Sequence, residues 1–152
     1  MTPAGNAYSH SETGWVMLAI MAGAAAVTAA VAILVFARAG ALYAFAFPPL
    51  FALVAANFYR LTVIVDAETI TASFGIGLIS KTVRLADIAS AEIARETWYG
   101  GWGLRWTGKG WFYTVNSLDA VALNLKGGRE FLIGTDEPQA LLAAIANSLK
   151  TL

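Results

Sequence analysis

The fold is set by residues 15–60, which read WVMLAIMAGAAAVTAAVAILVFARAGALYAFAFPPLFALVAANFYR. Two uncharged apolar runs, Trp15–Phe36 and Ala41–Tyr59, flank the tetrapeptide Ala37–Gly40. As helices they would be roughly 33 Å and roughly 28 Å long at about 1.5 Å per residue, close to the ~30 Å hydrocarbon core of a bilayer. The matched lengths and the compact turn predict a transmembrane helical hairpin.

Two other interpretations of these runs are weaker. A signal peptide is disfavoured because residues 1–14 contain no Lys or Arg and the first run exceeds the usual apolar region. In the second run, Pro48 and Pro49 remove two backbone donors. We therefore expect a kink there, and a re-entrant or interfacial element is the alternative to a full span.

The charges divide the chain at Arg60. The 152 residues are 58% hydrophobic and 13% charged, but before Arg60 the only formal charges are Glu12 and Arg38, with His10 added if it is protonated. The part from Arg60 onward has no net charge, which argues against nucleic-acid binding because that function needs a basic excess. The chain has no cysteine, which excludes disulfides, thiol nucleophiles and Cys-ligated zinc.

The first apolar run is rich in small residues at helical spacing, namely Ala22, Gly23, Ala26 and Ala30. Small residues at this spacing allow helices to approach closely in lipid. This face has two interpretations that the residues leave open. It packs against the hairpin's own second helix, or it docks onto another membrane protein.

The distribution of Lys and Arg predicts the orientation of the hairpin. The turn between the runs offers Arg38, whereas the segment after the second run offers Arg60, Lys81 and Arg84. Because Lys and Arg are enriched on the cytoplasmic side, we expect both termini and the soluble domain in the cytoplasm. The organisation is then a tail at 1–14, helices at 15–36 and 41–59, and a domain at 60–152.

The domain after Arg60 has the alternating patterns of an antiparallel sheet, with a Gly127-Gly128 hairpin turn. Near the end, Asp136 has the position of a helix cap, with Pro138 in the first turn and Gln139 at the capping-box position. We predict a membrane hairpin followed by an α+β domain, with about seven antiparallel strands in a bent sheet or partial barrel and a C-terminal helix. The expected strands are 61–65, 70–74, 79–85, 88–93, one within 98–113, 121–125 and 131–133.

Two motifs carry a family resemblance. Residues 98–105 read WYGGWGLR and residues 134–138 read GTDEP. With the strand order and the terminal helix, they resemble the bacterial pleckstrin-homology-like domains that are attached to short membrane hairpins. The resemblance covers about residues 60–149. It implies a PH-like fold and a non-enzymatic binding or assembly module.

The chief candidate site is an aromatic, glycine-rich stretch. Aromatic side chains dominate interfaces, so these residues form either a partner-docking surface or a platform on lipid headgroups. The alternative is a structural corner filled by tryptophans. We expect Trp102 and Trp106 to point inward and Trp98 and Trp111 outward. The candidate residues are Trp98, Tyr99, Trp102, Trp106 and Trp111.

Lipid headgroup binding and catalysis find little support in the sequence. The first hairpin turn, Asp66-Ala67-Glu68, is acidic, whereas eukaryotic pleckstrin-homology domains grip phosphates there with basic residues. His10 is the only histidine and lies in the tail, so we expect no catalytic residue, cofactor or metal ion.

These observations favour a non-enzymatic accessory, assembly or scaffolding subunit of a larger membrane protein complex. Its expected partners are other subunits of that complex and the lipid bilayer, without nucleic acid. The alternatives are a membrane-tethered lipid- or ligand-sensing module and a PH-like domain that forms homo-oligomers.

Overall fold

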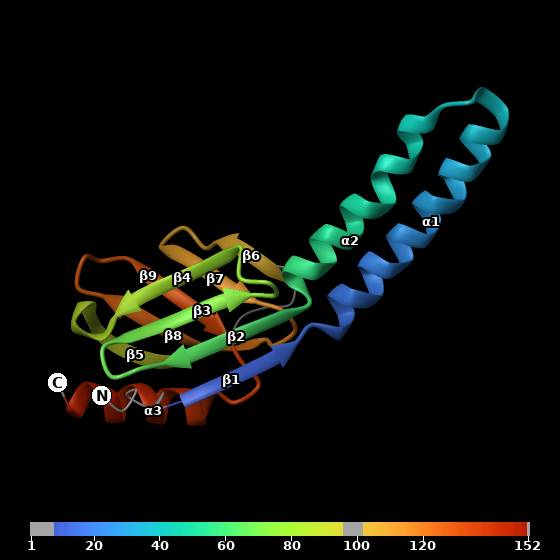
Figure 1. Ribbon diagram of the computed structural model, residues 1–152. Coiled ribbons are helices and arrows are strands. Elements are labelled where there is room, and N and C mark those ends of the chain that lie inside the picture. The colour runs from blue at the N-terminus through green and yellow to red at the C-terminus, as the bar shows by residue number, and fades with distance from the viewer. Residues whose placement is uncertain (1–7, 96–101, 152) are drawn as a thin grey trace, which may run out of the picture.

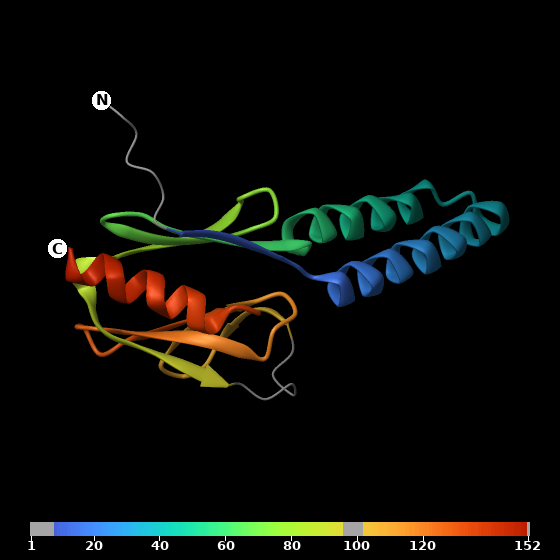
Figure 2. The same cartoon turned by 90° about the horizontal axis from the view of Figure 1, so that it is seen from below.

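The structure is a computed structural model that describes residues 8–95 and 102–151. A pair of apolar helices projects from one end of a two-layered β-sandwich (Figure 1). A C-terminal helix covers one open side between the two sheets (Figure 2). The observed fold is therefore α+β: in the described residues one strand precedes the helical pair, eight strands follow it, and a helix comes last.

The hairpin begins with α1, Trp15–Ala39, which is capped by Gly40 in the left-handed conformation (φ 64°). Among the described helices, α1 is long and apolar enough to cross a membrane, and Leu42–Phe58 is a shorter apolar segment. That segment consists of a 3-10 helix, η1 (Leu42–Ala46), and α2 (Phe47–Phe58). The expected mid-helix kink is wrong, because Pro48 and Pro49 occupy the first turn of α2, where the lost donors would have no helical partner.

The first sheet contains four antiparallel strands in the order β1-β2-β3-β4. The expectation of a tail at residues 1–14 is wrong for Tyr8–Thr13, which form the first strand of this sheet. The chain therefore enters the hairpin from one strand and leaves it into the neighbouring strand, since β1 pairs with β2 from Tyr8↔Val65 to Thr13↔Arg60. The strands are β1 (Tyr8–Thr13), β2 (Arg60–Val65), β3 (Thr69–Phe74) and β4 (Ile79–Arg84).

The second sheet follows a short 3-10 helix, η2 (Leu85–Asp87), and has the order β5-β8-β9-β7-β6. The described residues thus form nine strands rather than about seven, because β1 is added and the aromatic stretch divides into two. The expectation of a wholly antiparallel sheet is also wrong, since β7 and β9 are parallel. The strands are β5 (Ile88–Arg95), β6 (Gly103–Trp106), β7 (Gly110–Thr114), β8 (Asp119–Leu125) and β9 (Glu130–Gly134).

The C-terminal helix α3, Pro138–Lys150, has the predicted position, with Pro138 in its first turn. The predicted cap is wrong, because Glu137 occupies the N-cap position without a side-chain hydrogen bond. Leu141 and Ile145 of α3 are fully buried and close the core between the sheets. That core is built from the inward-facing residues of both sheets, including Leu61, Val65, Ile70, Phe74, Leu123 and Phe131.

Candidate functional site

The base of the hairpin is joined directly to the first sheet. The Gly14 N–H donates to the Tyr59 carbonyl oxygen at 2.8 Å, immediately beyond the last β1–β2 pair. The Leu18 N–H then donates to the Gly14 carbonyl oxygen at 2.9 Å and starts the ladder of α1. Two adjacent strands thus continue into two adjacent helices without a linker (Figures 1 and 2). A movement of the hairpin relative to the domain would have to deform β1 and β2.

The small-residue face of α1 points away from α2. Ala22, Gly23, Ala26 and Ala30 are all exposed, and a Cβ added at Gly23 would meet no other atom within 4 Å. Contact with α2 is instead made along a different side of α1, where Ala32 is buried. The hairpin's own packing therefore does not use these four residues, and their contact with a partner stays a prediction.

The aromatic residues of β6 and β7 divide between the core and the surface. Phe112 and Tyr113 are buried. Trp106 and Trp111 are exposed and stack edge-to-face with ring centroids 5.4 Å apart, so the expectation that Trp106 points inward is wrong. Trp98 and Tyr99 lie outside the described residues.

Trp102 stands apart from this pair, at the end of the domain that faces the hairpin. Its Nε1–H donates to the Asn116 carbonyl oxygen at 3.2 Å while the residue remains exposed, so the expectation that it points inward is also wrong. It borders a shallow, mainly apolar recess that Met17, Met21 and Phe58 line from the helix side. Trp102 therefore belongs to the junction between the hairpin and the domain.

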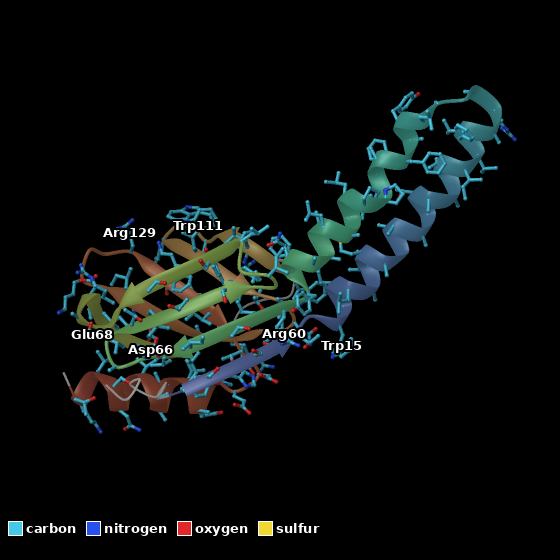
Figure 3. The ribbon with its side chains drawn as sticks, viewed as in Figure 1. Trp15, Arg60, Asp66, Glu68, Trp111 and Arg129 are labelled. Carbon is cyan, nitrogen blue, oxygen red and sulfur yellow. The ribbon has the colours of Figure 1, made fainter. Side chains whose placement is uncertain are left out.

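Beside the Trp106–Trp111 pair lies a shallow recess of about 80 Å³. Lys81 of β4 and Arg129, just before β9, contribute cations to its lining, and Glu130 contributes a carboxylate. Figure 3 shows Trp111 and Arg129 on the same side of the domain. The two cations are suited to an anionic group, and the exposed indole rings offer a surface on which a planar group can stack. Among the described residues, this recess combines exposed aromatic rings with two cations.

A polar cluster that no local sequence pattern indicates joins β1 to the start of α3. The His10 Nε2–H donates to Asp136 Oδ1 at 2.7 Å, and His10 Nδ1 lies 3.5 Å from Glu137 Oε2. Asp136 therefore binds a histidine 126 residues away instead of capping α3. The cluster ties the strand that leads into the membrane-length helix to the far end of the chain.

Glu12 lies near this cluster on the same strand and is only 7% exposed. The Ser117 hydroxyl donates to Glu12 Oε1 at 2.7 Å, whereas Oε2 is buried without a hydrogen-bond partner among the described residues. Burial raises the pKa of the Glu12 carboxyl, and Asp136 raises it further, although the Ser117 hydrogen bond and His10 lower it. The folded protein therefore holds the proton of this carboxyl to a higher pH than water would.

The acidic turn predicted to oppose phosphate binding lies far from the hairpin. Figure 3 shows Asp66 and Glu68 at the opposite end of the first sheet from Trp15 and Arg60. Of the two cations of β4, Lys81 and Arg84, the second is paired with Asp87, since Arg84 Nε lies 3.1 Å from Asp87 Oδ2. Within residues 8–95 and 102–151, no group of three His, Cys, Asp or Glu side chains is arranged to hold a metal ion.

Comparison with known proteins gives this chain no family. No protein-family model matches the sequence, and no curated protein matches it. Its function must therefore be inferred from its own residues and from the way the fold arranges them.

Proposed function

We propose that the protein is a non-enzymatic accessory, assembly or scaffolding subunit of a larger membrane protein complex. It is anchored by a two-helix transmembrane hairpin. A PH-like domain lies on the cytoplasmic side of a bacterial inner membrane.

The observation that carries the proposal is the outward exposure of the hairpin's apolar side chains. Val27, Ile33 and Leu34 of α1 are each more than half exposed, and the only charge between Trp15 and Tyr59 is Arg38. A helix that is hydrophobic all round is buried in protein or in a membrane. α2 covers one side of α1 and the described domain covers only its base, so lipid or partner helices are needed to cover the outward side.

The dimensions of the hairpin support two crossings. The 25 residues of α1 extend roughly 38 Å at about 1.5 Å per residue. The twelve residues of α2 extend roughly 18 Å, and the five residues of η1 add roughly 10 Å at about 2 Å per residue. The returning limb thus reaches roughly the ~30 Å thickness of a hydrocarbon core. Arg38 lies at the tip of the hairpin, whereas Arg60 lies at its base and Lys81 and Arg84 lie in β4 of the domain. This excess of cations on the domain side favours a cytoplasmic domain.

The small-residue face of α1 supports the role as a subunit. Because Ala22, Ala26 and Ala30 point away from α2, they are open to a helix from another chain. Close packing of small residues is a principal source of helix association in lipid. Because no linker separates the hairpin from the sandwich at Gly14 and Tyr59, a partner that fixed the position of the hairpin would also fix that of the sandwich.

A steric block of the outer face tests this proposal. We expect the full chain, extracted in mild detergent from its native membranes, to co-purify with a discrete membrane protein in constant ratio. The double variant Ala26→Leu/Ala30→Leu should lose that partner. The matched control Val27→Leu/Val31→Leu changes exposed residues on another side of α1 and should retain it. A chain that is monomeric and partner-free at native abundance would contradict the proposal, and a pure homo-oligomer would favour self-assembly instead.

The recess beside Trp106 and Trp111 favours a second candidate function, a membrane-tethered sensor of an anionic lipid or ligand. Lys81 and Arg129 supply the charges that such a ligand requires. A titration of the solubilised chain with dihexanoyl-phosphatidylglycerol, followed by tryptophan fluorescence, tests it. A saturable change that Lys81→Ala/Arg129→Ala abolishes and Lys150→Ala preserves would support sensing. An unsaturable response, equal in all three proteins, would exclude it.

A further inference from the structure

The two turns at opposite ends of β3 differ in chemistry. The β2–β3 turn is Asp66-Ala67-Glu68, whereas the β3–β4 turn is Gly75-Ile76-Gly77-Leu78. The six residues of β3 separate them, roughly 20 Å at about 3.3 Å per residue. The acidic turn points away from the hairpin and the apolar turn points toward it (Figures 1 and 3). The first sheet is therefore polarised along the direction of the hairpin.

The apolar turn exposes two large side chains where a soluble protein would place polar residues. Ile76 is 58% exposed and Leu78 is 69% exposed. Between Arg60 and Lys81 the only charged residues are Asp66 and Glu68 of the acidic turn, at the far end of β3. The apolar turn itself therefore carries no charge. The turn itself is well formed, because the Gly77 N–H donates to the Phe74 carbonyl oxygen at 2.7 Å. Packing within the domain therefore does not explain why the exposed residues Ile76 and Leu78 are apolar.

The turn is fixed against the last turn of α2. The Gly75 N–H donates to the Arg60 carbonyl oxygen at 2.7 Å. A Cβ added at Gly75 would overlap the carbonyl oxygens of Ala56 and Asn57, so only glycine permits this approach. The neighbouring Phe74 also packs on Phe58, with ring centroids 5.1 Å apart. The position of the β3–β4 turn along the hairpin axis is thus fixed by the end of α2.

The end of α2 carries the marks of a membrane–water interface. The Arg60 guanidinium lies over the Tyr59 ring, 5.3 Å from its centroid, and Trp15 is exposed at the start of α1. Aromatic side chains of this kind concentrate where hydrocarbon meets the headgroups. A turn held beside Ala56 and Asn57 lies at that level if the hairpin spans the bilayer.

We propose that the β3–β4 turn inserts Ile76 and Leu78 into the interfacial region of the lipid bilayer and so holds the sandwich in a fixed orientation on the membrane. The occupant is lipid because the exposed apolar surface of the turn continues that of the hairpin. This inference rests on the proposed membrane anchorage. Two separated contacts, the hairpin and the turn, would prevent the domain from tilting about the hairpin.

Site-directed labelling tests the inference directly, because the chain contains no cysteine. Full-length variants Ile76→Cys and Leu78→Cys carry a nitroxide label in proteoliposomes of 3:1 phosphatidylcholine and phosphatidylglycerol. Power saturation then compares collisions with oxygen, which concentrates in lipid, and with a water-soluble nickel chelate. Ala67→Cys at the acidic turn is the aqueous control and Val27→Cys in α1 is the lipid control.

We expect labels at Ile76 and Leu78 to favour oxygen over nickel at least about threefold more than the label at Ala67, at a depth shallower than Val27. Labels at Ile76 and Leu78 that match Ala67, while Val27 is in lipid, would overturn the inference and leave the anchor intact. A Val27 label that also matches Ala67 would overturn both. Quenching of bimane at the same cysteines by lipids doxylated near the headgroup gives an independent measure, and the absence of quenching at Ile76 and Leu78 would likewise overturn the inference.

Discussion

Leu34 in α1 and Leu123 in β8 are the same residue in regular secondary structure, yet Leu34 is 57% exposed and Leu123 is 0% exposed. The difference recurs throughout the molecule. The sandwich turns its large apolar side chains inward around one core, whereas α1 turns Val27, Ile33 and Leu34 outward. A single sequence thus follows two rules of burial, which is expected when its two parts face different solvents.

The largest expected effect comes from truncating Leu123, and the same truncation at Leu34 tests whether the two leucines lie in different environments. Leu123→Ala should destabilise the protein by about 2–5 kcal/mol, because it leaves a cavity in a closed core. Leu34→Ala should change stability by about 0.5 kcal/mol or less, as at exposed positions. Chemical denaturation of the detergent-solubilised chain, followed by the circular dichroism of the sheets, measures both. Equal losses would show that α1 is packed against protein in a way that the structure does not contain.

A charge introduced into α1 tests whether its exposed apolar side chains face hydrocarbon. Val27→Arg should oppose membrane insertion by about 2.5–3.5 kcal/mol at the centre of a spanning helix. The fraction of chain that resists alkaline carbonate extraction measures the loss, and Val27→Ala is the control. If the Arg variant stays in the membrane fraction as fully as the Ala variant, then Val27 does not face hydrocarbon.

The junction between the two regions should be sensitive to one methyl group. Gly77→Ala forces a left-handed backbone (φ 85°) in open space and should cost about 1–2 kcal/mol. Gly75→Ala meets the same backbone restriction (φ 43°) and also the carbonyl oxygens of Ala56 and Asn57, so its cost should exceed that of Gly77→Ala. Thermal unfolding in detergent ranks the two variants. The reverse order would mean that the β3–β4 turn is not pressed against α2.

The smallest expected effect concerns the buried carboxyl of Glu12. Its folded-state pKa is raised, chiefly by burial, so its contribution to stability is complete below the unfolded-state pKa and is lost as the pH rises through the folded-state pKa. Glu12→Gln removes that titration, so the stability of the variant relative to wild type should rise as the pH passes through the folded-state pKa of Glu12. Melting temperatures measured from acidic to neutral pH test this. A difference between wild type and variant that does not change with pH would contradict it, and the exposed Glu68→Gln is the control.

The sequence alone was sufficient to locate an element where the spacing of its apolar residues matches the pattern of burial. In β2, Leu61, Val63 and Val65 alternate with exposed or half-buried residues, and this alternation located the strand. By contrast, β1 reads YSHSET, which has no apolar alternation. It is held by the ladder to β2, by Ser11–Thr62 (2.9 Å) and by His10–Asp136. All of these partners are distant in sequence, so local patterns could not reveal the strand.

The same limit applies to the candidate site. Sequence alone identified Trp106 and Trp111 as candidates, but it did not place Lys81 and Arg129 beside them, because β4 and β9 belong to different sheets. The parallel pairing of β7 with β9 brings Trp111 opposite Phe131, and no hairpin signal encodes a parallel pair. Pro48 and Pro49 lie near the middle of the second apolar run. The change from a 3-10 helix to an α-helix at Phe47 nevertheless places them at the start of a helix.

The most direct test of the central claim, that α1 faces lipid while the sandwich faces water, is the reactivity of single cysteines in sealed proteoliposomes. The full-length variants are Val27→Cys, Ile33→Cys and Ala67→Cys, and the reagent is a membrane-impermeant maleimide. We predict that Ala67→Cys reacts in the molecules whose domain faces outward, whereas Val27→Cys and Ile33→Cys remain unmodified. Reaction of Val27→Cys and Ile33→Cys to the same extent and at the same rate as Ala67→Cys would contradict the claim.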